Sequence, residues 1–251
     1  MTENQKQKQT VTYFIADLHL TQSRPDITSC FLRFLKNDAI QAEKLYILGD
    51  LFEFWIGDDD DSSFVRTISS ALHTLSSSGT QIYFIHGNRD FLVGKGFAKR
   101  SGMQLLPEID LIDLYGRDVV IMHGDTLCTR DVDYQKFRKK SRTWWWQLFM
   151  TNLPLFLRKK IAQNYRNKSA SATMLKPQEI MDVTPSEVVD CLTSYHCQLL
   201  IHGHTHKPFI HDLVANGEKA QRIVLGDWYD QGAWLKVTPE KIELLNQQFT
   251  K

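Results

Sequence analysis

The sequence contains too few cysteines for a disulfide framework. Its four cysteines, Cys30, Cys128, Cys191 and Cys197, include no C-x-x-C pair, which is typical of proteins from a reducing compartment. The chain also lacks an apolar run of the roughly 18 to 20 residues that a membrane-spanning helix requires. Residues 1–10, MTENQKQKQT, are polar, so we expect a flexible N-terminus rather than a signal peptide. These absences favour a cytoplasmic protein, or one that lies on a membrane surface.

The chain also lacks a strong excess of charge of either sign. A net charge of +1 over 251 residues excludes no class of partner, and 42% apolar residues suit one globular domain, with or without an insertion. The charge is unevenly distributed, because residues 130–168 contain eleven Lys or Arg and only two Asp. We therefore treat this segment as a separate feature of the chain.

Five apolar segments each end on Asp, Asn or His. The clearest is residues 46–48, which run into Gly49 and Asp50. The others are residues 11–16 before Asp17 and His19, 82–85 before Asn88, Arg89 and Asp90, 119–122 before His123 and Asp125, and 198–201 before His202, His204 and His206. One such residue is ordinary turn chemistry. Five together predict a site at the carboxyl ends of the strands, where ligands bind in open α/β sheets.

The rest of the pattern predicts strands alternating with helices, followed by a β-rich end. Apolar residues recur at helical spacing over residues 27–36, and a second helix is expected over 64–78. Residues 111–122 read as a hairpin, Thr184 as the cap of a helix, and residues from 209 onward as strands. The acidic run at 58–61 reads as a solvated loop. This periodicity alone supports an α/β protein with a β-rich tail.

The ordered set Asp-x-His, Gly-Asp, Gly-Asn-Arg-Asp, His-Gly-Asp and Gly-His-x-His resembles the calcineurin-like metallophosphoesterases. The segments GDLFEFWIGDDD (49–60), FIHGNRDFL (84–92), IMHGDTLCT (121–129) and LIHGHTHKP (200–208) are similar to those of its UDP-2,3-diacylglucosamine diphosphatase family. The resemblance covers nearly the whole chain after residue 10. It implies an αββα sandwich of two mixed β-sheets flanked by helices (class α/β or α+β). A single domain is expected over residues 11–251, with a helical lid inserted at about 126–182.

The resemblance further implies two divalent metal ions. Asp50 would bridge them, with Asp17, His19 and His206 completing one site and Asn88, His123 and His204 the other. Such a pair neutralises phosphoryl oxygens and makes water a nucleophile near neutral pH. The absence of Cys from the set disfavours structural zinc and favours an exchangeable ion, most simply Mn²⁺, with Fe and Zn left open. The expected catalytic residues are Asp50, Asn88, Arg89 and His123.

Arg89 departs from the general superfamily pattern, in which a histidine occupies this position. A phosphate monoester leaving from a diphosphate is a weak base that gains more from a fixed positive charge than from a proton. Guanidinium keeps its charge and can bind two phosphate oxygens at once. Arg89 therefore favours a diphosphate substrate, the alternative being a surface arginine paired with Asp90.

An apolar block at residues 144–157 lies inside the basic segment. It includes Trp144, Trp145 and Trp146, and cations both precede and follow it. In a helix three adjacent tryptophans cannot all face one core, so at least one is expected to face solvent, lipid or ligand. The block fits an element that lies on an anionic membrane surface, or one that lines a channel for acyl chains. A lid that buries its aromatics is the alternative, and nucleic-acid binding fits less well.

The resemblance implies a specific reaction. Water would attack the α-phosphorus of UDP-2,3-diacylglucosamine and give UMP and 2,3-diacylglucosamine 1-phosphate, a step of lipid A biosynthesis on the cytoplasmic face of the inner membrane. The implied substrate contacts are Asn88, Arg89, Asp131, Ser169, Thr173, Lys176 and His204. The implied partners are this lipid and an anionic membrane surface, without nucleic acid or an obligate protein partner. Another metallophosphoesterase activity, phosphodiesterase or nuclease, is the alternative, and a non-catalytic scaffold is a weaker one.

Overall fold

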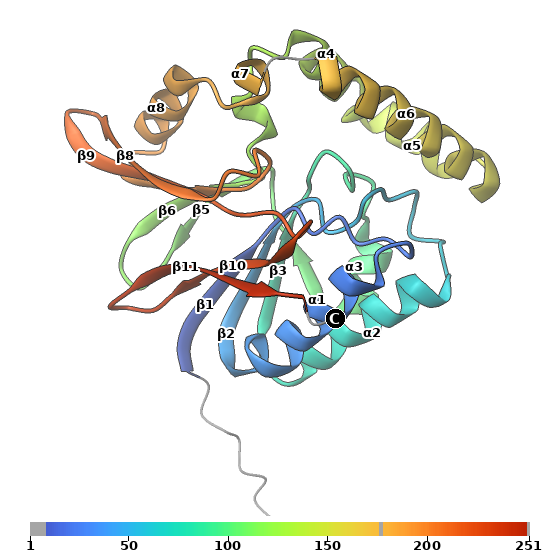
Figure 1. Cartoon of the computed structure of the whole chain (residues 1–251), viewed down its shortest axis with the longest axis horizontal. Coiled ribbons are helices and arrows are strands. Elements are labelled where there is room, and N and C mark those ends of the chain that lie inside the picture. Colours follow the sequence, from blue (N-terminus) through green and yellow to red (C-terminus); the bar gives the residue numbers. More distant parts are fainter. Residues whose placement is uncertain (1–8, 176–177, 250–251) are drawn as a thin grey trace, which may run out of the picture.

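Two β-sheets pack face to face between helices in the computed structural model, which describes residues 9–175 and 178–249 (Figure 1). Within these residues the first sheet has the strand order β11-β10-β1-β2-β3-β4 and the second the order β5-β6-β7-β9-β8. Strand β1 pairs in parallel with β2 and antiparallel with β10. In the second sheet β7 pairs in parallel with β6 and β9, whereas β5 pairs antiparallel with β6 and β8 antiparallel with β9, so both sheets are mixed.

The strands of the first sheet are β1 (Gln9–Ile15), β2 (Ala42–Leu48), β3 (Gln81–Ile85), β4 (Met103–Leu105), β10 (Gln231–Val237) and β11 (Ile242–Gln248). Those of the second are β5 (Ile109–Asp113), β6 (Asp118–Met122), β7 (Leu199–His202), β8 (Phe209–Ala215) and β9 (Glu218–Val224). The helices are α1 (Pro25–Asn37), α2 (Ser63–Ser77), α3 (Lys95–Ser101), α4 (Val132–Ser141), α5 (Trp144–Asn152), α6 (Leu155–Leu175), α7 (Gln178–Met181) and α8 (Pro185–Ser194), with short 3₁₀ turns at Ala39–Gln41 and Asp125–Leu127.

Three clusters of buried apolar residues separate the layers. One lies between the first sheet and helices α1 to α3, a second between the two sheets, and a third between the second sheet and α8. Along β6, Val119 and Ile121 belong to the cluster between the sheets, whereas Val120 and Met122 belong to the cluster under α8. A strand covered on both faces needs apolar residues at every position. The αββα sandwich is therefore confirmed.

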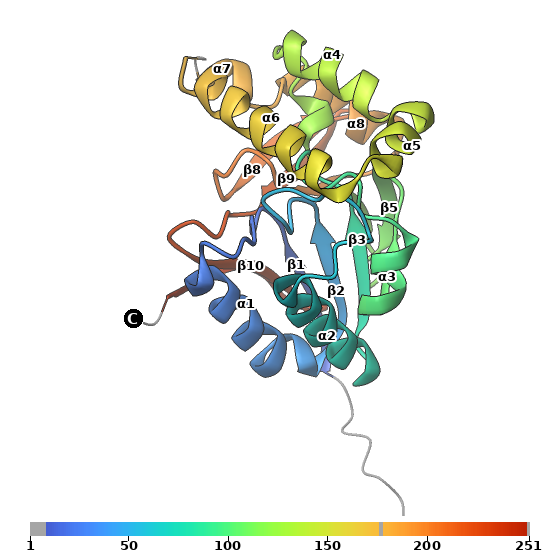
Figure 2. The same ribbon diagram turned by 90° about the vertical axis from the view of Figure 1, so that its right-hand side faces the viewer.

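The insertion helices α4 to α7 stand apart from the four layers. They connect β6 to α8, and Figures 1 and 2 both place α4 to α6 beyond the ends of the strands. In the part of the chain that the structure describes, no helix is both long enough and apolar enough to cross a membrane.

The structure adds elements that the sequence pattern did not predict. Helix α3 has only seven residues and β4 only three, too few for a periodic signal. The expected flexible N-terminus lies outside the described residues, except for Gln9 and Thr10, which belong to β1.

Candidate active site

Polar residues that follow five strands come together at one edge of the sandwich. Asp17 and His19 follow β1, Asp50 follows β2, Asn88 and Arg89 follow β3, His123 follows β6, and His204 and His206 follow β7. Strands β1 to β3 belong to the first sheet, and β6 and β7 to the second. The site therefore spans the seam between the two sheets.

The first of two ligand groups contains Asp17, His19 and His206. Asp17 Oδ1 lies 3.4 Å from His206 Nε2, and the Nε2 atoms of His19 and His206 are 3.4 Å apart. One ligand atom from each residue lies within 4.8 Å of the others. Asp17 and His19 are buried, at 0% and 3% exposed.

The second group contains Asn88, His123 and His204. Asn88 Oδ1 lies 2.9 Å from both His123 Nε2 and His204 Nδ1, and these two nitrogens are 3.2 Å apart. These three atoms therefore lie within 3.2 Å of one another. The structure thus brings together the residues predicted for the second metal site.

Asp50 lies between the two groups. Its Oδ2 is 4.0 Å from His19 Nε2 and 3.9 Å from His123 Nε2. Its other oxygen, Oδ1, accepts a hydrogen bond of 2.8 Å from the backbone N–H of Arg89. This placement suits a carboxylate shared between two cations.

The donor set fits a pair of divalent ions. It consists of carboxylate oxygens, an amide oxygen and imidazole nitrogens that face one another without sulfur. Asp17 Oδ1 is buried and has no hydrogen-bond partner among the described residues. A buried carboxylate oxygen without a donor is costly, and a bound cation would satisfy it.

The pKa values in the site diverge strongly. Burial raises the pKa of Asp50 to about 7, with Asp90 and Asp17 adding to the rise against the opposing effect of His123. Burial lowers the pKa of His19 to about 3 and that of His204 to about 4. The pKa values of His206 and His123 shift the other way, that of His206 to about 10 against the effect of burial, because of the carboxylates that face them, Asp17 and Asp50 foremost. The neutral form is the one that binds metal ions.

The backbone of the site is unusual. Asp17, His19, Asp50, His204 and His206 all have positive φ, between 50° and 70°, a region that non-glycine residues rarely adopt. Two glycines allow the loops to approach. A Cβ on Gly49 would lie 2.6 Å from the backbone of Gly87, and one on Gly87 would lie 2.1 Å from Asp50 Oδ1. No larger residue fits at either position without displacing the loops.

Two acidic residues support the site; the sequence placed Asp90 at a strand end without a supporting role and did not predict Asp227. Asp227 Oδ2 lies 2.9 Å from His206 Nδ1. Asp90 is fully buried and accepts backbone N–H bonds from Asp50, Leu51 and Gly87. Asp227 comes three residues after the end of β9, so it follows the same strand-end rule that identified the other residues.

Arg89 lies at the margin of the cluster. Its Nη1 is 3.9 Å from Glu53 Oε1, and its side chain is 27% exposed. The alternative pairing with Asp90 is not observed, because both oxygens of Asp90 accept bonds from backbone N–H groups.

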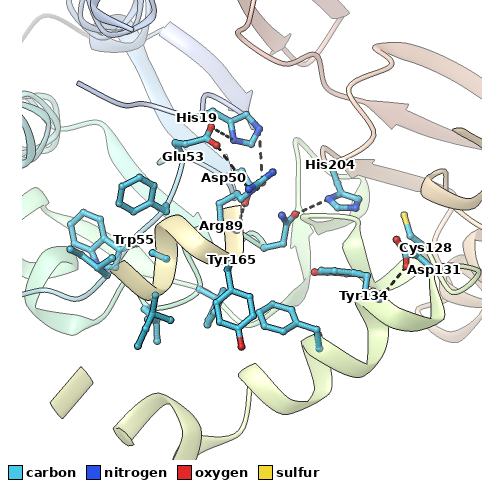
Figure 3. A pocket seen from close by; sticks show the side chains of 18 of the residues that line it. His19, Asp50, Glu53, Trp55, Arg89, Cys128, Asp131, Tyr134, Tyr165 and His204 are labelled. Atoms are coloured by element: carbon cyan, nitrogen blue, oxygen red, sulfur yellow. Dashed lines mark hydrogen bonds and ion pairs between the residues drawn. The ribbon is translucent and has the colours of Figure 1, made fainter. Parts of the chain in front are cut away.

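A pocket of about 610 Å³ opens from the cluster toward the insertion helices (Figure 3). His19, Asp50, Asn88 and Arg89 line its polar end. The remaining wall is largely apolar and includes Phe54, Trp55, Phe91, Phe137, Trp146, Met150, Ile161 and Tyr165. The pocket therefore joins a set of metal-type ligands to an apolar chamber.

The predicted substrate contacts fall in two places. Asp131 lines the pocket with Asn88, Arg89 and His204, and it caps α4 by accepting a 3.1 Å bond from the Tyr134 N–H. Ser169 and Thr173 belong to α6, but their side chains lie outside the described part of the structure, and Lys176 lies outside it entirely.

Comparison with known proteins identifies the family of this chain. A model of the calcineurin-like phosphoesterases matches residues 10–208. Proteins named UDP-2,3-diacylglucosamine hydrolase from Klebsiella pneumoniae, Vibrio atlanticus and Escherichia coli are 55%, 51% and 52% identical to it. Each comparison covers 95% of this chain, and 99%, 98% and 99% of the relative, respectively. The chain, with its ligand groups at the seam of two sheets, belongs to the calcineurin-like phosphoesterases, which use a dimetal centre.

Proposed function

We propose that this chain hydrolyses the diphosphate of UDP-2,3-diacylglucosamine, giving UMP and 2,3-diacylglucosamine 1-phosphate for lipid A biosynthesis. The observation that carries the proposal is the pocket, which opens from the polar cluster onto an apolar wall. A lipid that is joined to a nucleotide through a diphosphate matches this pocket, because its acyl chains suit the apolar wall and its diphosphate suits the polar cluster. Relatives that are 51% to 55% identical carry the name of this activity.

Two groups of residues would hold the metal ions. Asp17, His19 and His206 would bind one, Asn88, His123 and His204 the other, and Asp50 would contact both. When bound, such ions neutralise phosphoryl charge and lower the pKa of water. We propose Mn²⁺ because the nitrogen and oxygen donors include no thiolate.

Arg89 would act on the substrate directly. Its side chain is partly exposed at the polar end of the pocket, where it would bind the diphosphate oxygens through two parallel N–H bonds. The bond that breaks joins the α-phosphorus to the bridging oxygen, and the lipid phosphate leaves with the electron pair. A fixed positive charge beside that oxygen stabilises it without donating a proton.

The first test is hydrolysis of UDP-2,3-diacylglucosamine in water enriched with heavy oxygen, with and without Mn²⁺. Turnover that requires the ion and places the label in UMP is the expected result, since water attacks the α-phosphorus. Label in the lipid phosphate would contradict the point of attack. Absence of turnover in protein that contains two ions per chain would refute the substrate and direct attention to other phosphodiesters.

We also propose that the insertion helices dock on an anionic membrane, at the cytoplasmic face of the inner membrane. Trp146 and Met150 line the pocket, whereas other large apolar side chains of α5 and α6 face outward. These are Trp144, Trp145, Leu148, Phe149 and Phe156, which are 75%, 50%, 56%, 60% and 69% exposed. Lys139, Lys140, Lys159 and Lys160 flank them and are exposed. Apolar side chains ringed by cations suit insertion among anionic lipids.

Vesicle sedimentation tests this surface. The double variant Trp145→Ala, Phe149→Ala is expected to sediment less than the unaltered protein with anionic vesicles, because it loses two inserted aromatics. Phe209→Ala is the matched control, since Phe209 is 59% exposed on β8. Equal sedimentation of all three proteins would remove the proposed docking surface.

Ser169, Thr173 and Lys176 stay predictions from the family resemblance. As contacts of the nucleotide or the glucosamine, they would affect the KM for the natural lipid. Hydrolysis of a small phosphodiester that lacks both groups would be unchanged in Lys176→Ala.

A further inference from the structure

Two of the four histidines in the proposed metal groups share one pattern, whereas His204 faces the site through Nδ1. His123 and His206 direct Nε2 toward the site, and each has an oxygen behind its other ring nitrogen. For His123 this is the Leu48 carbonyl, 2.8 Å from Nδ1, and for His206 it is Asp227 Oδ2, 2.9 Å from Nδ1. An oxygen in this position fixes the tautomer and the orientation of a metal-binding imidazole.

His19 directs Nε2 toward the site in the same way, but its buried Nδ1 makes no hydrogen bond in the described structure. It faces Glu53 Oε2 at a distance of 3.5 Å (Figure 3). A small rotation of either side chain completes the bond, so Glu53 occupies the place that Asp227 occupies behind His206.

The second oxygen of Glu53 faces a different group. Oε1 lies 3.9 Å from Arg89 Nη1, the side chain expected to bind the diphosphate. Glu53 is only 6% exposed, and a carboxylate at that depth requires charged or hydrogen-bonding neighbours. Its backbone N–H donates to Leu20 O over 3.1 Å, which holds the turn after β2 against the segment that carries His19.

We propose that Glu53 is a positioning residue that serves both halves of the reaction. One oxygen accepts the Nδ1–H of His19 and keeps Nε2 directed at the first metal site. The other holds the Arg89 guanidinium at the entrance of the pocket. This inference rests on the metal and arginine roles of the proposed function, but not on the identity of the lipid.

Two substitutions separate the two contacts. In Glu53→Leu both oxygens are lost at similar volume. In Glu53→Gln the amide oxygen still accepts from His19, while the NH₂ group faces Arg89, where donor meets donor. Glu43→Gln is the control, because Glu43 lies on β2 ten residues earlier and outside the site.

The first readout is Mn²⁺ binding to the metal-free proteins by calorimetry and electron paramagnetic resonance. Glu53→Leu should weaken one of the two ions about 10- to 100-fold, the usual effect of removing an outer partner of a ligating histidine. Glu53→Gln should weaken it less, and Glu43→Gln not at all. Full affinity for both ions in Glu53→Leu would overturn the proposal.

The second readout separates positioning from folding. The metal-free variants should unfold at the same temperature as the unaltered protein. In the Mn²⁺-saturated proteins, binding of inorganic phosphate measured by calorimetry should weaken in both Glu53 variants because Arg89 is released. Loss of both ions together with a lower unfolding temperature would identify a structural residue and refute the proposal. Because no readout uses the diacylglucosamine lipid, failure of the proposed substrate would leave these results interpretable.

Discussion

At the scale of a single residue, Arg89 connects the candidate metal ligands to the pocket. Its backbone N–H binds Asp50 Oδ1, and its side chain reaches the pocket beside Glu53. The same residue therefore contacts the proposed bridging carboxylate through its backbone and can contact the substrate through its guanidinium. The contribution of Arg89 to catalysis should depend on the planar shape of the guanidinium as well as on its positive charge.

Arg89→Lys tests that dependence. Lysine keeps the charge but loses the planar pair of N–H donors, so kcat/KM for the diphosphate should fall about 10- to 100-fold, the equivalent of one hydrogen bond to a charged group. Steady-state kinetics with Arg66→Lys as the control would measure the change, because Arg66 lies on α2 in an exposed ion pair. A change within experimental error would mean that charge alone is sufficient.

Individual residues also show how far the sequence could predict the site. His123, His204 and Asp50 directly follow apolar strands, and this placement predicted their convergence. Glu53 escaped notice because it lies in a turn, where nothing in the spacing reveals that Leu20 holds it beside His19. Contacts made by loop packing depend on the tertiary structure and leave no periodic signal.

At the scale of elements, charged contacts hold helices α4 and α6 on the rest of the protein. On α4, Arg138 Nε binds Asp125 Oδ2 at 2.9 Å and its Nη2 binds Glu108 at 2.7 Å. At the start of α6, Arg158 is 3% exposed and binds the carbonyl of Ile56 at 2.6 Å and the carboxylate of Asp59. Of these two arginines, Arg158 also lines the pocket.

Residues 58–61 form the expected loop, and Asp59 is 58% exposed, but two carboxylates of this loop also make contacts that the sequence did not predict. Asp58 accepts from the backbone N–H groups of Gly94 and Phe97, and Asp59 pairs with Arg158. The partners of Asp58 and Asp59 lie far away in the sequence, and the composition of the acidic run does not predict that these segments come together.

Arg158→Ala should loosen α5 and α6 without unfolding the sandwich. Asp59 is 58% exposed, so its carboxylate stays solvated after its partner is lost. The substitution should therefore weaken mainly the contact between α6 and the sandwich. Hydrogen exchange should increase across α5 and α6, and the KM for the lipid should rise about tenfold. Lys159→Ala is the control because Lys159 is exposed. Faster exchange throughout the first sheet would show that Arg158 stabilises the whole fold instead.

The same contact predicts a pH effect. Its hydrogen bond with Arg158 lowers the pKa of Asp59, against the weaker effect of burial. An acid whose folded pKa is depressed adds stability above its unfolded pKa, near 4, and that stability is lost as the pH falls through the lower value. Hydrogen-exchange protection in α5 and α6, corrected for the intrinsic exchange rate at each pH, should therefore fall below about pH 4 in the unaltered protein, and this loss should be absent in Arg158→Ala.

For the whole molecule, the ligand groups lie where two independent sheets meet. The first group combines Asp17 and His19 of one sheet with His206 of the other, and the second combines Asn88 with His123 and His204. Bound ions would therefore link the sheets across their seam, at the end of the apolar cluster that joins them.

Chelation should accordingly lower the unfolding temperature. An ion present at 100 times its dissociation constant adds about 2.7 kcal/mol to the stability of the folded state, so removal of two ions should have an effect readily seen by calorimetry. Restoring Mn²⁺ should recover the original value in the unaltered protein but not in Asp50→Ala. An unfolding temperature that is independent of chelator would argue against ions that link the sheets.

The stability of this protein in the cell should also depend on the supply of metal. Five residues of the site have positive φ angles: Asp17, His19, Asp50, His204 and His206. If each left-handed residue costs about 1 kcal/mol, the five residues, which lie in three loops, together cost about 5 kcal/mol, which approaches the entire stability of a small domain. Ion binding would offset that cost, whereas a chain made during metal starvation would bear it in full. Unfolded chains are removed by proteases, so scarcity of the metal would reduce the abundance of this protein as well as its rate of catalysis.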